Sequence, residues 1–230
     1  MTITEHIAAV RREMAEAARE SGRSERDIFL VGASKMNDAA ACQEAIAAGV
    51  DALGENRVQE MTAKLAQNAY DGAPLHFIGH LQRNKVKQVV GHVALIQSVG
   101  SLELLDEIEK VAAARGLVQD ILLEVNIGRE AAKSGFAPEK VLPAAEAALE
   151  RTHVRVRGLM TIPPADAQRD ANFRYFQEVQ ALYVDMNQKL FHNELEYLSM
   201  GMSGDYEDAI RAGATMVRVG SAIFGARHYN

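Results

Sequence analysis

The sequence predicts an α/β protein folded as a single (β/α)8 barrel of the TIM type, with one extra helix before the first strand. Short apolar runs alternate with amphipathic stretches of helical spacing along the whole chain. The length of 230 residues fits one such barrel. Because no Pro/Gly/Ser-rich linker interrupts the series, we expect residues 1–230 to form one domain and no second domain to follow.

Eight short apolar runs predict the strands, and many of them are hydrophobic on both faces, as buried parallel strands are. A repeat of eight this regular favours a closed barrel over an open doubly wound sheet. In chain order the predicted strands cover residues 28–34, 51–54, 75–79, 95–99, 121–127, 154–162, 197–200 and 216–220.

The stretches between these runs predict a helix after each strand. Gly49, Gly116 and Gly213 each stand between a predicted helix and the next strand, where a helix C-cap takes up the left-handed conformation. The extra helix is expected over residues 4–21. The clearest of the other helices cover residues 38–48, 102–114, 138–149 and 171–190.

Composition restricts the partners. The net charge is −6 and the basic residues are scattered, which argues against nucleic acid. The one cysteine, Cys42, cannot form an internal disulfide and is expected to be a small buried hydrophobe on a helix. No apolar run approaches the ~20 residues of a membrane span, and the acidic N-terminus is unlike a signal peptide. We expect a soluble cytoplasmic monomer with no membrane partner.

Functional side chains of such a barrel lie at the C-terminal ends of the strands. Lys35 ends the first predicted strand, where desolvation would lower its pKa and expose a nucleophilic amine. The alternative is a lysine that reaches out to solvent. The residues at these strand ends are Lys35, Glu55, Asn56, His80, Ser98, Asn126, Met160, Thr161, Ser203, Gly204 and residues 218–221.

Two Ser-Gly pairs follow the last two strands. Ser203-Gly204 and Gly220-Ser221 stand in the loops that commonly bind phosphate in these barrels, where glycine permits close approach to the backbone and serine donates a hydrogen bond. An N-capping serine and a turn glycine are the structural alternatives. We expect the neighbouring Asp205 to face away from a bound phosphate.

Arg218 lies among apolar residues of the eighth strand, where an arginine needs a partner such as an anion or a ring nitrogen. A lysine, a phosphate site and an arginine at one barrel mouth suit an aldehyde phosphate, either pyridoxal 5′-phosphate (PLP) or a sugar phosphate. His80 alone is little evidence for a particular ligand. No His, Cys or carboxylate group has metal-ligand spacing, so we predict no metal site.

With these residues in place, the sequence resembles the pyridoxal phosphate homeostasis protein family, whose fold is related to the N-terminal domain of alanine racemase. The matching motifs span nearly the whole chain. They are LVGASK, GENRVQE (54–60), HFIGHLQRNK (76–85), EVNIGREAAKSGF (124–136), RGLMTIPP (157–164) and LSMGMSGDYEDAIRAGATMVRVGSAIFG (198–225).

The resemblance implies a role for each candidate. Lys35 matches the lysine that forms a Schiff base with PLP, and Arg218 matches the arginine on the pyridine nitrogen. Ser203, Gly204, Gly220 and Ser221 match phosphate contacts, Asn56, His80 and Met160 match neighbours of the ring or rim, and Lys133 matches a lysine near the mouth. Residues 36–38 depart from the usual Thr-Lys-Pro after the lysine, so the first loop is expected to differ.

The resemblance also implies a carrier of PLP in homeostasis or delivery to apo-enzymes, with no catalytic residues. A positively charged arginine on the ring nitrogen keeps that nitrogen unprotonated, which weakens the ring as an electron sink. The alternatives are a PLP-dependent racemase or decarboxylase-like enzyme of the same fold and, further off, a Schiff-base aldolase acting on a sugar phosphate.

Overall fold

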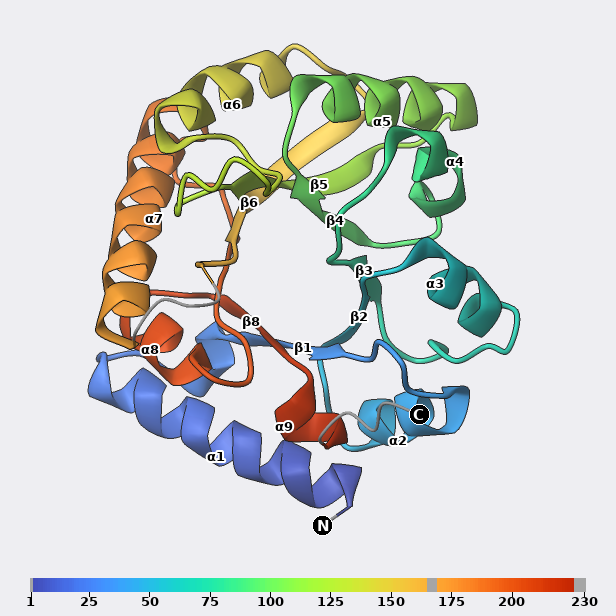
Figure 1. The fold of residues 1–230 in the computed structure, drawn as a ribbon, viewed down its shortest axis with the longest axis vertical. Helices are drawn as coiled ribbons and strands as arrows, with labels where there is room; N and C mark the ends of the chain where they lie inside the picture. The colour runs from blue at the N-terminus through green and yellow to red at the C-terminus, as the bar shows by residue number, and fades with distance from the viewer. Residues whose placement is uncertain (1, 165–168, 226–230) are drawn as a thin grey trace.

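The computed structural model describes residues 2–164 and 169–225, which contain a closed barrel of eight parallel strands in chain order (Figure 1). Each strand pairs with the next, and β8 closes on β1. The predicted (β/α)8 barrel is therefore confirmed. The strands are β1 (Phe29–Ala33), β2 (Ala52–Glu55), β3 (Leu75–Phe77), β4 (Leu95–Val99), β5 (Gln119–Val125), β6 (Val154–Thr161), β7 (Tyr197–Ser199) and β8 (Met216–Val219).

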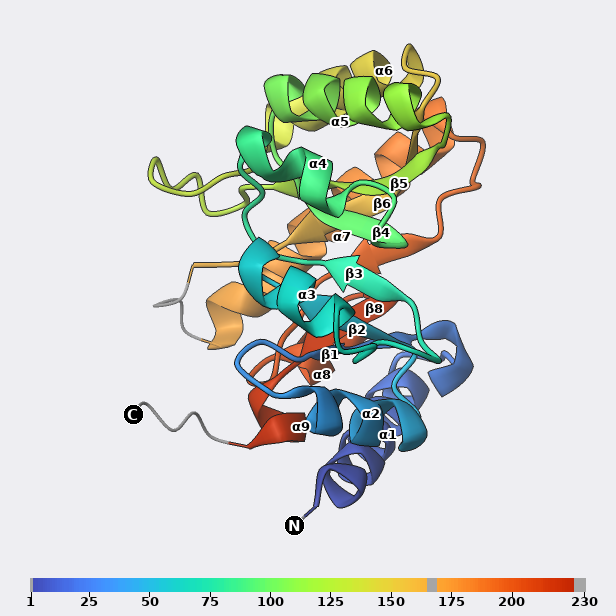
Figure 2. The ribbon, with the colours of Figure 1, turned by 90° about the vertical axis from the view of Figure 1, so that its right-hand side faces the viewer.

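A helix follows every strand and lies outside the barrel (Figures 1 and 2). Three short 3-10 helices, Glu25–Asp27, Arg83–Lys85 and Pro138–Lys140, precede β1, α4 and α6. The α-helices after the strands are α2 (Ala39–Ala47), α3 (Val58–Leu65), α4 (Val86–Val89), α5 (Leu102–Arg115), α6 (Val141–Leu149), α7 (Arg169–Leu190), α8 (Tyr206–Arg211) and α9 (Ser221–Phe224).

The predicted extra helix is α1 (Ile3–Glu20), which packs on the outside of the barrel against α2, α8 and α9 (Figure 1). Thr2 and Glu5 form a capping box at its start, which satisfies backbone N–H groups that have no partner within the helix. Ile7, Val10 and Met14 are buried at helical spacing. The amphipathic helix α1 thus covers the first and the last two β/α units.

The hydrophobic residues form two clusters. The larger one packs the helices onto the outer face of the strands. The smaller one fills the inside of the barrel with Val31, Ala52, Leu95, Leu122, Met160 and Met216. Because the interior is packed with side chains, as in other barrels of this kind, a ligand has room only at the rim.

Most predicted boundaries agree with the structure to within two residues. β5 begins at Gln119, two residues before the predicted strand, because the backbone of Gln119 and Asp120 already pairs with β6. Gly49, Gly116 and Gly213 have φ values of +96°, +63° and +107°, which confirms their left-handed conformation.

Cys42 is buried in α2, as predicted. Its thiol lies beside the polar side chains of Ser34 and Lys64, so its surroundings are more polar than those of a simple apolar core position. Among the helices in the described part of the chain, none has the length and apolar character needed to cross a membrane.

Candidate functional site

A cavity of about 250 Å³ opens where β1, β7 and β8 end. Parallel strands bring their C-terminal ends to one face, so segments more than 160 residues apart in sequence meet there. Six of the predicted site residues line this cavity, namely Lys35, Ser203, Gly204, Arg218, Gly220 and Ser221.

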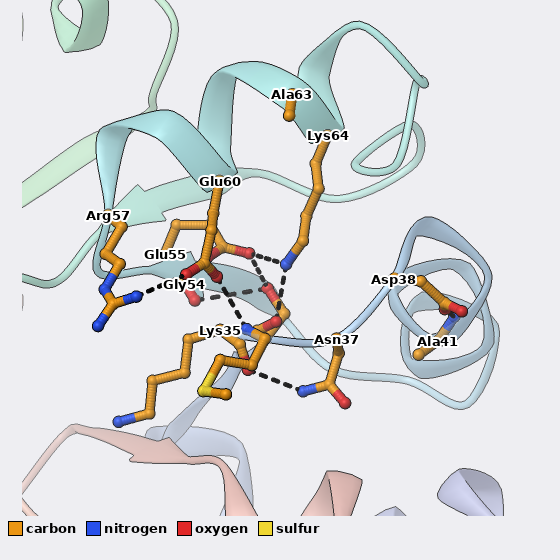
Figure 3. A network of polar contacts seen from close by, with 12 residues as sticks. Lys35, Asn37, Asp38, Ala41, Gly54, Glu55, Arg57, Glu60, Ala63 and Lys64 are labelled. Carbon is orange, nitrogen blue, oxygen red and sulfur yellow. Dashed lines mark hydrogen bonds and ion pairs between the residues drawn. The ribbon is translucent and has the colours of Figure 1, made fainter. Parts of the chain in front are cut away.

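Lys35 lies in a turn after β1. The prediction that it ends the strand is wrong by two residues, since β1 ends at Ala33. The main chain turns because Met36 is left-handed, with a φ of +63°, and the Asn37 side chain donates to the Lys35 carbonyl at 3.0 Å. The Lys35 side chain extends away from the polar cluster around Glu55 (Figure 3). It lines the cavity as a result.

The loops after β7 and β8 are joined through Ser203. Its hydroxyl oxygen accepts the backbone N–H groups of Gly220 at 3.1 Å and Ala222 at 3.2 Å. Two accepted bonds use both lone pairs of the hydroxyl, which leaves its proton to donate. A Cβ added to Gly204 would meet no atom within 4 Å, whereas one added to Gly220 would lie 3.3 Å from the Ala33 carbonyl oxygen. A side chain at Gly220 would therefore press on the end of β1.

Arg218 is buried in β8, and its guanidinium donates to the Ser199 hydroxyl and to the Thr161 carbonyl. Ser199 donates in turn to Gln97 Oε1 at 2.7 Å, and Gln97 Nε2 lies 3.0 Å from His76 Nδ1. We name Arg218, Ser199, Gln97 and His76 the barrel relay. These bonds fix the plane of the guanidinium at the inner wall of the cavity.

The charge on Arg218 is retained at neutral pH. Burial lowers its pKa to about 10, while the carboxylates of Asp205 and Glu124 oppose that shift. Asp205 accepts the Met202 N–H at 2.7 Å and the Asn172 side-chain amide at 3.1 Å, and it does not line the cavity. This agrees with the prediction that Asp205 faces away from a bound anion. Burial raises the pKa of both carboxyl groups.

Three predicted site residues lie outside this cavity. Met160 is fully buried in the inner cluster of the barrel, because its side chain points inward from β6. Asn56 follows β2, with its Oδ1 buried and without a hydrogen-bond partner. His80 lines a larger cavity of about 590 Å³ together with Lys133, at the ends of β3, β4 and β5. The structure thus separates His80 and Lys133 from the Lys35 cavity.

Five further residues line the Lys35 cavity, namely Ala33, Asn37, Met202, Phe224 and Gly225. These five residues lie close in sequence to predicted site residues, and this proximity is the signal that could have identified them. Gln97, by contrast, lies inside β4 and outside every matching motif. Ser199 ends β7 and falls within the 198–225 motif, but its side chain contacts only other side chains, so its chemistry did not single it out. Within residues 2–164 and 169–225, no group of three His, Cys, Asp or Glu side chains could hold a metal ion.

The model of the alanine racemase N-terminal domain matches residues 6–228. The pyridoxal phosphate homeostasis protein of Aquifex aeolicus is 41% identical over the full length of both chains. The protein of that name in Pseudomonas aeruginosa is also 41% identical, over 99% of this chain and 97% of the relative.

Among solved structures, PipY of Synechococcus elongatus with PLP bound is similar, with a TM-score of 0.84 and 31% identity over 97% of this chain and 100% of PipY. Its form without PLP has a TM-score of 0.87. From the full-length identity to named relatives and the match of the domain model, the chain belongs to the pyridoxal phosphate homeostasis proteins, within the alanine racemase N-terminal domain family.

Proposed function

We propose that this protein binds PLP in the Lys35 cavity as a Schiff base and serves PLP homeostasis or delivery without catalysing a reaction, with the barrel of residues 1–230 as one binding domain. The observation that carries the proposal is the meeting of Lys35, Arg218 and the two Ser-Gly pairs at one cavity. PLP bound to PipY and the names of the full-length relatives support it over the racemase alternative.

The chemistry of the cavity fits the cofactor. The Lys35 amine suits an aldehyde, and the buried positive charge of Arg218 suits a ring nitrogen that accepts a hydrogen bond. The fixed Ser203 hydroxyl, the Ser221 hydroxyl and the open space above Gly204 suit a phosphate. Bound there, PLP would supply a reactive aldehyde and an electron-withdrawing ring.

The lining also supports a role without catalysis. Among the described residues that line the cavity, none carries an imidazole, phenol or carboxylate group, so none besides Lys35 could exchange a proton with a substrate carbon near neutral pH. Arg218 stays protonated at neutral pH, since its pKa is about 10, and it offers no proton to the ring. A cavity lined in this way can hold the cofactor, but its described lining has no base on the other side of the ring to exchange a proton with a substrate.

Borohydride reduction tests the proposal. The unmodified protein with PLP should show the visible absorbance of a Schiff base, and reduction should leave a pyridoxyl group on the peptide that contains Lys35. The control is Lys35→Ala, which should show neither signal. A label mainly on Lys133 or Lys85 would show that another lysine forms the Schiff base. No label at all would show that the protein forms no Schiff base with PLP.

A further inference from the structure

One helix, α3, holds the main chain on both sides of Lys35 (Figure 3). The Lys64 ammonium donates to the Ser34 carbonyl oxygen at 2.8 Å, just before Lys35. The Met36 N–H, just after Lys35, donates to Glu60 Oε2 at 2.8 Å. Glu60 and Lys64 stand four residues apart and therefore lie on the same face of the helix.

The Lys64 side chain is buried together with a residue of opposite charge. Lys64 is 7% exposed and pairs at 2.6 Å with Glu55, which is fully buried at the end of β2. The Ser34 and Tyr70 hydroxyls also bond to Glu55 Oε1, at 2.7 and 3.1 Å. Burying an ion pair is costly unless its geometry and hydrogen bonds are good. The ion pair orients the Lys64 ammonium so that one of its N–H groups donates to the Ser34 carbonyl oxygen, next to Lys35.

The Glu60 end holds a residue in an unfavourable conformation. Met36 has a left-handed backbone that side chains other than glycine rarely adopt, and its own side chain is 57% exposed. Burial of the methionine therefore does not account for the turn. The Asn37 N–H closes the turn on the Ser34 carbonyl oxygen at 3.1 Å, and the bond from the Met36 N–H to Glu60 fixes the turn against α3. Arg57 contacts the other Glu60 oxygen at 3.6 Å.

We propose that Glu60 and Lys64 are positioning residues that aim the Lys35 amine into the cavity. The inference rests on the proposed function, in which Lys35 carries PLP. The remaining bonds of Asn37 to the Ser34 and Lys35 carbonyl oxygens lie within the turn and do not fix it against α3. Without the two contacts to α3, the turn could therefore shift as a unit, and the Schiff base would lose its fixed place relative to Arg218. PLP would then leave faster, and the pH at which the Schiff-base nitrogen titrates would change with its surroundings.

The first test compares three variants of α3 as holoproteins. Glu60→Ala removes the acceptor of the Met36 N–H and should release PLP at least fivefold faster, with a shifted pH midpoint of the visible absorbance. Glu60→Gln keeps an amide oxygen as acceptor and should restore both properties. Gln59→Ala, on the exposed side of α3, is the matched control and should behave like the unmodified protein. Thermal unfolding of each variant separates loss of fold from loss of position.

The second test concerns Lys64. Lys64→Met alone would leave Glu55 charged and unpaired, so the variant of choice is Glu55→Gln combined with Lys64→Met, which removes both buried charges. It should fold and still release PLP faster than the unmodified protein, because the Ser34 carbonyl keeps the Asn37 N–H within the turn but has lost its bond to α3.

Unchanged release and an unchanged pH midpoint in both Glu60→Ala and the double variant would overturn the positioning role. Absence of a Schiff-base band in the unmodified protein would instead refute the proposed function, so the two failures are distinguishable.

Discussion

Ser203 shows how one hydroxyl can organise two loops. Its oxygen accepts the N–H groups of Gly220 and Ala222, which binds the loop after β7 to the start of α9. A backbone N–H at a helix start lacks a partner within the helix, so the serine satisfies groups that would otherwise need water or an anion. Its remaining proton is a donor at the cavity wall. Ser203 is not the N-cap of the helix that follows it, because that position belongs to Asp205. It bonds instead to the start of α9, and its remaining proton suits the proposed phosphate contact.

Replacing Ser203 with alanine should separate these two roles. We expect PLP affinity to fall by about tenfold or more, because a hydrogen bond to a charged group contributes about 1.5–3 kcal/mol. Pyridoxal, which lacks the phosphate, should lose far less affinity. Titration of the apoprotein with both ligands measures the difference. Equal losses for PLP and pyridoxal would show that Ser203 acts through the fold, and Ser21→Ala at the end of α1 serves as a control.

The sequence predicted the residues whose chemistry and strand-end position coincide, and it missed those that act through contacts alone. Lys35 and Arg218 were identified because a basic residue at a barrel mouth is chemically conspicuous. Met160 also matched a motif, yet its inward direction from β6 places it in the packed interior. Glu60 ends the motif GENRVQE and Lys64 lies outside the motifs, and neither was assigned a role, because an acid and a base on a helix usually indicate a solvated surface.

At the scale of secondary structure, the barrel relay crosses four strands. His76 in β3, Gln97 in β4, Ser199 in β7 and Arg218 in β8 are joined by hydrogen bonds inside the barrel. The direction of the bonds is set by Arg218, which can only donate, so Gln97 turns its amide nitrogen toward His76 Nδ1. The imidazole must accept that bond and is therefore neutral. Burial lowers the pKa of His76 to about 4, which agrees with this arrangement.

The relay predicts a loss of stability in acid. The pKa of His76 is lower in the folded protein than its unfolded value of about 6.5, so its contribution is complete above pH ~6.5 and is lost as the pH falls toward 4. Between pH 7.5 and 5 the free energy of unfolding should fall by about 2 kcal/mol from this group. Urea unfolding at the two pH values measures the change.

His76→Gln, which cannot titrate, is the comparison for this prediction. It should be less stable than the unmodified protein at pH 7.5, because the ring packs face to face with Phe29 at 5.7 Å between centroids. Its stability should nevertheless fall by less between pH 7.5 and 5. The same fall in both proteins would mean that other groups, and not His76, cause the acid sensitivity.

Strands were easier to predict than the short helices. The strands are buried on both faces and leave continuous apolar runs, so β4 was placed at its observed limits. The four-residue helices α4 and α9 are too short to show a helical period, and their presence follows only from the repeat of the barrel. The turn at Met36 combines local bonds of Asn37 with a contact to α3, and the contact to α3 leaves no signal in the local sequence.

At the scale of the whole molecule, the closed barrel brings Lys35, in the turn after its first strand, to the same cavity as Arg218 of its last strand. The pairing of β1 with β8 places Val31 opposite Arg218, so barrel closure itself creates the cavity. The interior below is packed with apolar side chains and the barrel relay, which bury the guanidinium except where it meets the cavity. The assembly holds a charged group at constant protonation beside an amine, which suits storage of an aldehyde cofactor more than proton transfer.

The holoprotein should therefore not turn over amino acids. Incubated with L- and D-alanine, serine and lysine in deuterated water, it should exchange the α-hydrogen no faster than free PLP, as measured by NMR. The physical reason is that Arg218 keeps its proton and that no second acid or base lines the described cavity. Lys35→Ala with added PLP gives the background rate.

The variant Arg218→Glu tests whether Arg218 is the reason why the α-hydrogen does not exchange. A carboxylate beside the ring nitrogen favours its protonation, so exchange per bound PLP should rise above that of the unmodified protein. Total PLP binding should fall, because the new carboxylate lies near Asp205 and Glu124. Stereochemical inversion of alanine by the unmodified protein would identify a racemase and contradict the carrier role. Exchange that stays at background in Arg218→Glu would show instead that the missing opposing base, and not the arginine, prevents the reaction.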